Sequence, residues 1–598
     1  MSDALAASLP RRAKVRYRAA ILAVLALGAL ALVIFGPMFL DRFSINVLTR
    51  SMIYAILAIT VDLLWGFAGI LTFGQAAFFG VGAYATAMLL THIGSSPALI
   101  GLALVLAIVV PIVLGVFVGW LSFYYGSTPI YATVISLVFP IVVTQLIYSG
   151  GTLTGSSSGM VGYYGLPFGL EGFFRLSGIC LVIVAVGALV FVRSDGGRIL
   201  TAIRDNETRC AYLGLSTQRI KILLTAVLAG VAGLAGFLYA NASGVVAPEN
   251  TGFVFGTELV VWTALGGRGT VLGPVLGTIG IDYLSANLSG ELPFLWQLII
   301  GALFVVMIIF LPNGLAALVT RFTRRRRENR PAGTGPQLVA EAPVHHMDNG
   351  DGPLLSIDRL EKSYGSQKVL EDITLDVAPG ELVSLVGPNG AGKTTMMRCL
   401  TDGKESSAGA VRIAGRDIAG MIPNQIVALG VGRKFQVASV FESLTVAECL
   451  RMARAALDTP SFVSASDSLG LPSAAIEILQ LTGLDQLLST QVSLLSHGQK
   501  QSLELAMVVA LEPRMILLDE PTAGLTKAER TTIGTILKKL TNELGFAAIL
   551  VEHDLDFVRD ISSRIVVLHQ GRLVLDGSVD EVVNSDIVKT IYSGGDHV

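Results

Sequence analysis

The sequence predicts two domains of different class. An N-terminal, all-α polytopic membrane domain with about ten transmembrane helices is followed by a C-terminal α/β P-loop domain. Long apolar runs such as "AAILAVLALGALALVIFGPMFL" fill the first half, and the second half joins a buried strand, the turn "GPNGAGKTT" and a helix. Hydrophobic residues make up 52% of the 598 residues and charged residues only 15%, which is unusually apolar for a soluble protein.

A junction separates the two classes. The stretch "LVTRFTRRRRENRPAGTGPQLVAEAPVHHMDNGDGPLLSI" leaves an apolar run, passes a group of arginines, and continues in Pro, Gly and small polar residues. We therefore expect four parts, which are a cytoplasmic N-terminal tail (1–19), a transmembrane domain (20–320), a basic, flexible linker (321–352) and a C-terminal domain (353–598). The net charge of −2 gives no general attraction to nucleic acid. The four cysteines form no CxxC pair, so neither a disulfide framework nor a zinc site is expected.

The apolar runs of the first half have the length that a bilayer requires. Ten candidate spans lie near 20–40, 46–65, 70–92, 98–122, 129–148, 176–192, 218–242, 253–266, 270–287 and 294–312. The short runs near 253–266 and 270–287 are compatible with broken or re-entrant helices, which leaves eight or nine spans as the alternative. With ten spans, nearly all basic residues outside them fall on one face, in segments 11–18, 193–221, 268 and 321–327. The positive-inside rule makes that face cytoplasmic.

Few polar residues lie inside these spans. They are Asp62, Gln75, Gln145, Glu258 and Asp282. Ionisable groups within a membrane usually face a cavity or a partner, which makes contact with a solute one interpretation. Solvation is the simpler interpretation for Glu258 and Asp282, because both lie near probable span ends.

One cytoplasmic segment is longer and more charged than a connection requires. The sequence "GRILTAIRDNETRCAYLGLSTQRIKILL" is compatible with a helix from Ile199 to Leu213. A short amphipathic helix there is suited to docking into a soluble partner. A basic loop that only fixes the topology is the alternative.

The second half contains a full P-loop in the stretch "LVSLVGPNGAGKTTMMRCL". Its backbone N–H groups and the following helix N-terminus are suited to cradle phosphates. Lys393 is expected to reach the β- and γ-phosphates, and Thr394 to place its hydroxyl on Mg²⁺. The expected ATP-binding residues of this loop are Gly387, Pro388, Asn389, Gly390, Ala391, Gly392, Lys393, Thr394 and Thr395.

Two further motifs extend this site. In "RMILLDEPTAGL", the strand Ile516–Leu518 ends at Asp519, which can hold Mg²⁺, and Glu520 is placed to polarise the attacking water. In "LLSHGQKQSLELAMVVALEP", the small-residue turn Ser496, His497, Gly498 and Gln499 opens an amphipathic helix. That helix start is a second anion-binding N-terminus, which suggests that nucleotide is sandwiched between two copies of the domain.

Residues 353–598 resemble the ATP-binding subunit of ABC transporters, an α/β ATPase domain with a helical subdomain. Tyr364 in "KSYGSQKVL" matches the adenine-stacking position, and Gln436 in "GRKFQ" matches the Q-loop residue that senses the γ-phosphate and is a ligand of Mg²⁺. "LSHGQ" matches the signature motif, Asp519 and Glu520 the Walker B pair, and His553 in "ILVEHDLDFV" the switch histidine. The resemblance implies Glu520, His553 and Gln436 as catalytic residues.

Two positions depart from the family pattern. His497 replaces the usual second glycine of the signature motif, so a bulky side chain stands where the backbone usually approaches nucleotide closely. Thr526 stands where many family members have Asp, which affects the expected contact across the dimer. Neither departure removes a catalytic group.

Within this family, "GRKFQ", "EPTAGLT" and "LSHGQKQ" resemble the ATPases of branched-chain amino acid importers and of the related urea and amide importers. "LTFGQAAFFGVGAYATAMLL" and "GRILTAIRDNETRCAYLGLST" are similar to the permease subunit of the same importers, over about 45–320. This resemblance implies a coupling segment at about 197–221, with Arg204, Asp205 and Asn206 near its centre.

The resemblance implies an ATP-driven importer subunit in which permease and ATPase are fused, with ATP and Mg²⁺ as cofactors. The implied location is a bacterial cytoplasmic (inner) membrane, with the ATPase on the cytoplasmic side. The expected partners are a small-molecule solute, a second permease and ATPase half, and a periplasmic or lipid-anchored substrate-binding protein. Branched-chain or related hydrophobic amino acids are the expected solutes, and urea, short-chain amides or aromatic acids are the alternatives. Two other classes fit less well. An exporter half-transporter usually has six spans with long cytoplasmic extensions, so ten spans argue against it. An ATPase that is only anchored to the membrane would not need ten spans.

Overall fold

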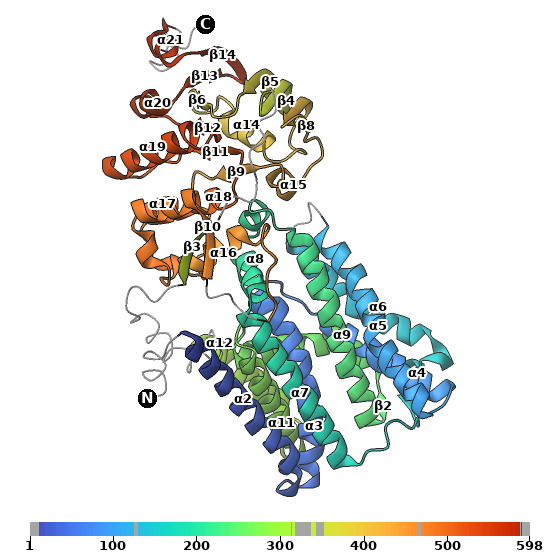
Figure 1. The fold of residues 1–598 in the computed structure, drawn as a ribbon. Helices are drawn as coiled ribbons and strands as arrows, with labels where there is room; N and C mark the ends of the chain where they lie inside the picture. The colour runs from blue at the N-terminus through green and yellow to red at the C-terminus, as the bar shows by residue number, and fades with distance from the viewer. Residues whose placement is uncertain are drawn as a thin grey trace. The chain divides into compact units, whose positions relative to one another are not determined.

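The computed structural model describes residues 11–124, 129–311, 314–316, 336–341, 352–463, 468–586 and 588. The chain forms two compact units, each of which is described by itself (Figure 1). The helical unit contains the described residues of Met1–Leu200, Gln218–Asn329 and Phe462–Ser464. The α/β unit contains those of Thr201–Thr217, Arg330–Ser461 and Ala465–Val598. The segment Thr201–Thr217 therefore belongs to the α/β unit although apolar runs precede and follow it in the sequence.

Apolar helices make up most of the helical unit. They are α2 (Arg11–Phe35), α3 (Arg42–Asp62), α4 (Gln75–His92), α5 (Pro97–Phe123), α6 (Pro129–Ser149), α7 (Leu170–Arg193), α9 (Thr217–Ser243), α10 (Phe253–Gly266), α11 (Leu272–Glu291) and α12 (Trp296–Phe310). Each of the ten predicted runs overlaps one of these helices, and α2 begins inside the expected N-terminal tail. Six described helices are long and apolar enough to cross a membrane, namely Ala20–Met38, Arg42–Phe67, Pro97–Phe123, Ile130–Ser149, Leu170–Arg193 and Thr217–Ser243.

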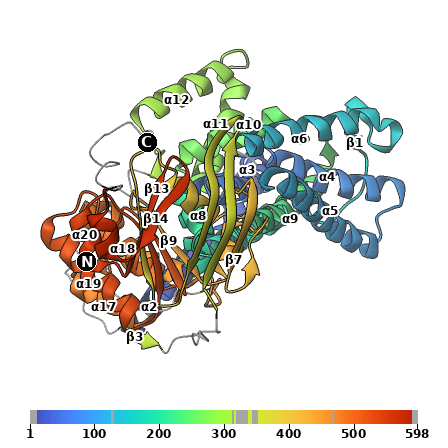
Figure 2. The same ribbon diagram turned by 90° about the horizontal axis from the view of Figure 1, so that it is seen from above.

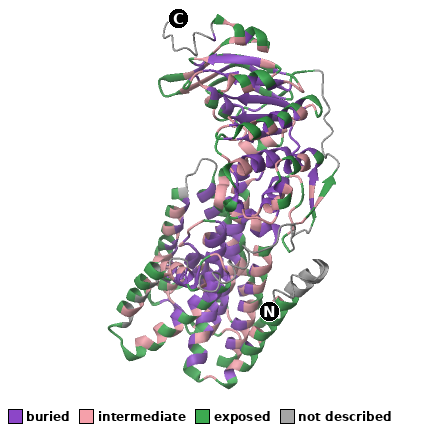
Figure 3. Ribbon diagram, turned by 90° about the vertical axis from the view of Figure 1, so that its left-hand side faces the viewer, coloured by how far each residue is buried: buried purple, intermediate pink, exposed green. Residues whose placement is uncertain are grey.

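The helical unit has both a buried interior and an apolar exterior. In an apolar stretch of 18 residues within Arg42–Phe67, which contains α3, 89% of the residues are buried, whereas in such a stretch of the more apolar α5 only 22% are. Val113 and Phe117 of α5 are among its exposed side chains. Figure 3 shows buried residues inside this group of helices and exposed residues along its outer faces. Large exposed apolar surface is unfavourable in water but matches lipid tails, as expected for membrane-spanning helices.

The buried carboxylate of Asp62 stabilises a turn between two helices. Asp62 ends α3 and is followed by the π-helix Leu63–Phe67. Its Oδ1 accepts a hydrogen bond from the Gly269 N–H, and its Oδ2 accepts one from the Val271 N–H at 3.0 Å. Val271 has a positive φ of 61° directly before α11. Asp62 therefore satisfies backbone donors of the tight turn that joins α10 to α11.

The other polar residues predicted inside spans have different surroundings. The Arg50 guanidinium donates to Asp282 Oδ1 at 2.9 Å, and the Ser51 hydroxyl donates to Asp282 Oδ2 at 2.6 Å, so Asp282 joins α11 to α3. Gln75 is buried and accepts a hydrogen bond from Thr60 at 3.1 Å. The remaining two residues are exposed, and they are Gln145 and Glu258.

The glycine-rich segment between α6 and α7 is fixed by several contacts. Strands β1 (Met160–Val161) and β2 (Val245–Val246) pair antiparallel. The Tyr163 hydroxyl donates to the Ala240 carbonyl at 2.7 Å, and the Leu166 N–H donates to the Asn241 side chain at 2.9 Å. These bonds hold the segment against the C-terminal end of α9 and against the strand that follows it.

The α/β unit is built on two sheets (Figures 1 and 2). The six-stranded sheet has the order β14-β13-β6-β12-β11-β9, and its pairs are parallel except for β13 with β14. Its strands are β6 (Leu382–Val386), β9 (Val431–Lys434), β11 (Met515–Asp519), β12 (Ala547–Val551), β13 (Arg564–His569) and β14 (Arg572–Gly577). The antiparallel sheet β5-β4-β7-β8 consists of β4 (Leu355–Tyr364), β5 (Gln367–Val377), β7 (Ala408–Ile413) and β8 (Arg416–Asp417).

Helices accompany these sheets, and their buried faces complete the core of the unit. They are α14 (Lys393–Cys399), α15 (Pro423–Val427), α16 (Val446–Arg454), α17 (Ser473–Leu481), α18 (His497–Val509), α19 (Lys527–Asn542), α20 (Leu555–Ile561) and α21 (Val579–Asn584). The central strands β6, β11 and β12 read as nearly continuous apolar runs because both faces of the sheet are covered there. All residues of β6, β11 and β12 are buried.

Part of the expected flexible linker is a strand. Residues Gln337–Glu341 form β3, which pairs in parallel with β10 (Ser468–Pro472). Glu341 also lies 3.4 Å from the guanidinium of Arg454. The linker therefore differs from the expectation at this point, because its backbone completes the edge of β10. The basic residues Arg324–Arg327 lie outside the described part of the chain.

Candidate nucleotide site and coupling segment

The predicted P-loop connects β6 to α14, and its glycines hold conformations that other residues rarely adopt. Gly387, Gly390 and Gly392 have φ values of 154°, 83° and 106°. A Cβ atom on Gly387 would lie 2.1 Å from the Leu568 carbonyl oxygen, so only glycine fits there. Asn389 and Gly390 are exposed at the tip of the loop, while Ala391 is buried beneath it. The loop thus has the folded shape that a phosphate cradle requires.

Lys393 reaches back over this loop. Its Nζ donates to the carbonyl oxygens of Gly387 at 2.6 Å and Pro388 at 3.0 Å. Burial lowers the pKa of Lys393, and the nearby carboxylates of Glu520 and Asp519 oppose that shift. An anion beside the ammonium would offset the unfavourable burial of its charge, which suits the predicted contact with phosphate.

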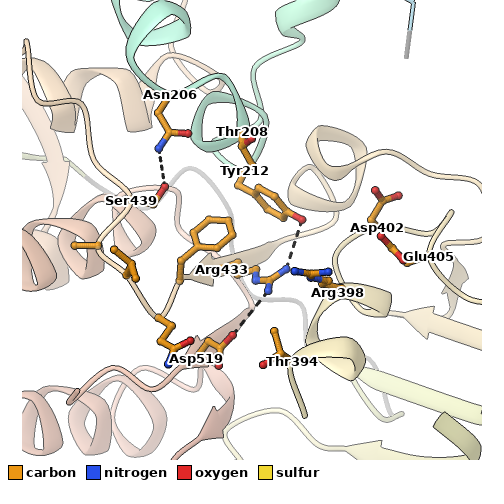
Figure 4. Close-up of a pocket in the computed structure, with 14 residues that line it drawn as sticks. Asn206, Thr208, Tyr212, Thr394, Arg398, Asp402, Glu405, Arg433, Ser439 and Asp519 are labelled. Carbon is orange, nitrogen blue, oxygen red and sulfur yellow. Dashed lines mark hydrogen bonds and ion pairs between the residues drawn. The ribbon is translucent and has the colours of Figure 1, made fainter. Parts of the chain in front are cut away.

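The three residues predicted to hold Mg²⁺ line one cavity of about 590 Å³ (Figure 4). Thr394, Gln436 and Asp519 contribute a hydroxyl, an amide and a carboxylate to it, and Arg398 and Arg433 contribute positive charge. Mg²⁺ prefers oxygen ligands and usually keeps water and phosphate among them. The side chains present therefore fit this ion beside a nucleotide phosphate.

Asp519 lies at the end of β11, at the carboxyl edge of the sheet. It is 4% exposed, and the Arg433 guanidinium lies 4.0 Å from its Oδ2. Burial raises the pKa of Asp519, whereas Arg433 lowers it. The charges of Lys434 and Lys393 also lower it, so Asp519 is a buried carboxylate surrounded by positive charge.

Two of the predicted catalytic residues, Gln436 and His553, contact the carboxylate of the third, Glu520. Gln436 Nε2 donates to Glu520 Oε2 at 2.7 Å, and His553 Nε2 lies 2.8 Å from Glu520 Oε1. Glu520 has a left-handed backbone with a φ of 44°, while its N–H is bonded to the Val551 carbonyl at 2.9 Å. A strained non-glycine residue that the surrounding sheet holds in place is often functional. The arrangement can orient a water molecule and accept its proton.

The predicted adenine-stacking residue stands at the end of β4. Tyr364 is 46% exposed, and the Lys362 ammonium lies 4.7 Å from the centre of its ring. Lys362 also pairs with Glu405 at 2.9 Å, and Glu405 lines the cavity. The exposed ring is thus available to a flat partner near the cavity.

The signature residues do not line this cavity. Ser496 caps α18, since its hydroxyl accepts a hydrogen bond from the Gln499 N–H at 3.3 Å, and Ser496 and His497 are exposed. The His497 ring lies next to Gly524, in the loop before α19, since a Cβ atom added to this glycine would be 3.4 Å from the ring. The signature residues therefore lie outside the cavity that Thr394 of the P-loop lines, which is compatible with the predicted sandwich between two copies.

The predicted coupling residues lie on α8 (Asp195–Ala211), which is broken at Asn206. Asn206 has a φ of −158° and a ψ of 88°, which differs from the continuous helix expected from Ile199 to Leu213. Its Oδ1 accepts from the Arg209 N–H at 2.9 Å, as a helix N-cap does. Its Nδ2 donates to the Ser439 hydroxyl at 3.0 Å. The asparagine thus starts a second short helix and binds the loop after Gln436.

The two residues before Asn206 bind the same loop. Asp205 accepts hydrogen bonds from the Ser443 N–H at 2.8 Å and from its hydroxyl at 2.9 Å. The Arg204 guanidinium donates to the Ser443 hydroxyl at 3.0 Å. All three predicted coupling residues therefore contact the stretch between Gln436 and α16.

Sequence reasoning missed Arg209 and Glu504. Their side chains form a fully buried ion pair at 3.2 Å. One signal was visible, because Glu504 is a single carboxylate in the otherwise apolar run "LELAMVVAL". No comparable signal marks Arg209, which is one of several charges in its segment.

Two family models match the chain. The model described as branched-chain amino acid transport system / permease component matches residues 43–308, and the model described as ABC transporter matches residues 370–523. Both matches overlap the regions for which the sequence motifs indicate the resemblance.

Two individual relatives are ATP-binding proteins of branched-chain amino acid transport. The high-affinity branched-chain amino acid transport ATP-binding protein LivG of Escherichia coli (strain K12) is 34% identical over 252 residues, which is 40% of this chain and 98% of LivG. The corresponding protein BraF of Pseudomonas aeruginosa is 32% identical over 248 residues, which is 40% of this chain and 96% of BraF. Among solved structures, cbiO1 of Clostridium perfringens, part of the ABC transporter complex cbiONQ, is 25% identical. It has a TM-score of 0.34 and covers 41% of this chain and 96% of its own.

Proposed function

The chain belongs to the branched-chain amino acid transport family of ABC transporters and joins a permease to an ATP-binding subunit, and from this premise we propose that it is one half of an ATP-driven importer. Its ATPase domain hydrolyses ATP in order to drive transport, and its apolar helices make it a multi-pass membrane protein. The observation that carries the proposal is the presence of the permease region, 43–308, and the ABC transporter region, 370–523, in one polypeptide.

We propose that another chain supplies the second half of the importer. One polypeptide carries one P-loop and one signature motif. Two composite ATP sites need two of each, which another copy or a separate permease and ATPase pair would supply. Ser496 and His497 of the signature motif are exposed, which leaves them accessible to the ATP site of a partner and supports this proposal. We propose the cytoplasmic (inner) membrane of a bacterium as the location, with the ATPase domain on the cytoplasmic side.

We assign the steps of ATP hydrolysis to residues of this chain. Lys393 and the backbone of the P-loop bind the phosphates, and Tyr364 stacks on the adenine. Thr394, Gln436 and Asp519 would hold Mg²⁺, which supplies positive charge to the transferring phosphoryl group. Glu520 takes a proton from the attacking water, and its contact with His553 at 2.8 Å supports that role.

Branched-chain or related hydrophobic amino acids are the solutes that we propose. The names of LivG and BraF support this class, because both are described as parts of branched-chain amino acid transport. Urea, short-chain amides and aromatic acids are the second candidates, and the run "LSHGQKQ" favours urea and amides.

A substrate-binding protein would deliver the solute to the segment between α6 and α7. This segment exposes several apolar side chains, namely Leu153, Val161, Tyr164 and Phe168. Exposed apolar groups on a segment held by hydrogen bonds offer a firm docking surface.

Purification of the full chain from its native membrane would test this proposal. Co-purifying chains identify the second half, and an associated binding protein can be screened with leucine, isoleucine, valine, urea, amides and aromatic acids. Stimulation of ATP hydrolysis by the ligand-loaded binding protein is the expected result. Stimulation by lipid or drug alone would contradict the importer and support an exporter half-transporter.

A further inference from the structure

A buried ion pair ties the coupling segment to the helix that carries the signature motif. Arg209 Nη1 lies 3.2 Å from Glu504 Oε1, and both side chains are fully buried. Glu504 stands in α18, which begins at the signature residue His497. Arg209 stands three residues after the helix break at Asn206, whose side chain holds the Arg209 N–H.

Both partners make further bonds to the strand and loop that lead into Gln436. Arg209 Nη1 donates to the Arg433 carbonyl at 2.9 Å, and the Phe435 N–H donates to Glu504 Oε1 at 3.1 Å. Gln436, the next residue, donates from its side chain to Glu520. A short connected series of hydrogen bonds therefore runs from Glu520 through the 435–436 backbone and Glu504 to Arg209.

The charges of this pair depend on one another. Burial raises the pKa of Glu504, and the charges of Arg209 and Lys434 oppose that shift. Removing one partner of a buried pair leaves an uncompensated charge, which is strongly unfavourable. The neighbouring bonds of Arg204 and Asp205 are more exposed, with side-chain exposures of 34% and 11%, and water competes with them. Any movement of α18 or of the Gln436 loop that keeps the pair together must therefore move Arg209 as well.

We propose that Arg209 and Glu504 are positioning residues that transmit the nucleotide state of the ATP site to the coupling segment. The inference rests on the proposed transport function and specifies how its coupling segment is driven. The surface contact with the 439–443 loop is made by Arg204, Asp205 and Asn206. The buried Arg209–Glu504 pair makes this coupling segment move together with the signature helix α18 and with the backbone at Gln436.

The test is hydrogen–deuterium exchange of the full chain with its native partners, with and without ATP and Mg²⁺. In the wild-type protein, ATP is expected to change exchange both in the P-loop and in residues 201–217. In Arg209→Met, the change at 201–217 is expected to disappear while the change in the P-loop remains. Arg209→Lys keeps the charge without the two-pronged donor and should give an intermediate response.

A double variant and a matched control separate positioning from simple loss of folding. Arg209→Met combined with Glu504→Met replaces both charges by apolar groups and is expected to recover at least part of the exchange response. Arg572→Met breaks an exposed Arg–Glu pair with Glu371 in the same unit, so it should behave as the wild type. In parallel, solute uptake per ATP hydrolysed should fall about tenfold in Arg209→Met and in Glu504→Met.

Two results would overturn the proposal. The first is an ATP response at 201–217 that persists in Arg209→Met. The second is a loss of both responses, in the P-loop and at 201–217, in each single variant and also in the double variant. An absence of uptake in the wild type, together with the expected exchange pattern, would count against the proposed solutes and leave the coupling role standing.

Discussion

Gln436 and Glu520 are joined by a hydrogen bond of 2.7 Å, although 83 residues lie between them in the sequence. His553 holds the second oxygen of the same carboxylate at 2.8 Å. The orientation of Glu520 is therefore set by two side chains from different loops. Because both loops follow parallel strands of one sheet, their residues meet at its carboxyl edge.

The first prediction concerns Glu520 as the general base. Glu520→Gln preserves the shape and one acceptor oxygen but cannot take a proton. Steady-state ATP hydrolysis by the full transporter is expected to fall by about 10²-fold or more. ATP binding, measured by equilibrium binding of a fluorescent analogue, should be retained.

A carboxylate away from the ATP site gives the matched control for that experiment. Glu477→Gln changes an acidic residue of α17 that pairs with Lys539 at 2.6 Å. Its hydrolysis rate should stay close to wild type. Near-normal hydrolysis in Glu520→Gln would exclude Glu520 as the base.

The second prediction concerns the break at Asn206. Asn206→Ala removes both the cap on Arg209 and the bond to Ser439, so uptake should fall while ATP binding is unchanged. Asn206→Asp keeps an oxygen for the cap but loses the donor to Ser439. An intermediate uptake in Asn206→Asp would show that the two bonds act separately, and normal uptake in Asn206→Ala would place coupling elsewhere. Transport of labelled solute into membrane vesicles measures the uptake of both variants.

The features that were predicted correctly depend on local sequence. The P-loop glycines and the strand before Asp519 lie within short stretches whose composition fixes their conformation. The apolar runs were likewise visible because their length alone matches a bilayer. Each of these signals is complete within about 25 residues or fewer.

The features that were missed depend on partners far away in the sequence. Asp62 satisfies backbone N–H groups more than 200 residues later, and β3 exists because it pairs with β10. The Arg209–Glu504 pair joins residues whose sequence separation is 295. Neither a helix period nor a motif spacing records such pairings, so only the folded chain reveals them.

The third prediction concerns the role of Asp62 as a structural residue. Asp62→Ala leaves the N–H groups of Gly269 and Val271 without an acceptor inside the helical unit. Each buried donor left unpaired is destabilising by about 1–3 kcal/mol, so the folded yield and the unfolding temperature in detergent should both drop. Asp62→Asn keeps one acceptor oxygen and should lose less.

A different result would indicate direct contact with the solute. If Asp62→Ala were folded with an unchanged unfolding temperature but failed to transport, Asp62 would contact the solute rather than support the turn. Size-exclusion profiles and thermal unfolding of the two variants distinguish these outcomes.

The last prediction concerns Thr526, at the position where the sequence departs from the expected aspartate. Thr526 is the N-cap of α19, and its hydroxyl and N–H both bond to Glu529 Oε2, at 2.8 and 2.9 Å. Thr526→Ala should lower the stability of the α/β unit by about 1 kcal/mol, whereas Thr526→Asp should retain it because aspartate is also a good N-cap. The thermal transition that ATP shifts upward reports on this unit.

The same capping bonds predict a pH dependence for the Thr526→Ala effect. The Thr526 N–H and hydroxyl hold the pKa of Glu529 below its usual range. A carboxylate whose pKa is lower in the folded state stabilises that state above its unfolded pKa, about 4.3, and this contribution is lost as pH falls through the folded value. The difference in unfolding temperature between wild type and Thr526→Ala should therefore be full at pH 7 and shrink below about pH 4. A difference that stays constant across this range would show that the ionised form of Glu529 does not contribute to the cap.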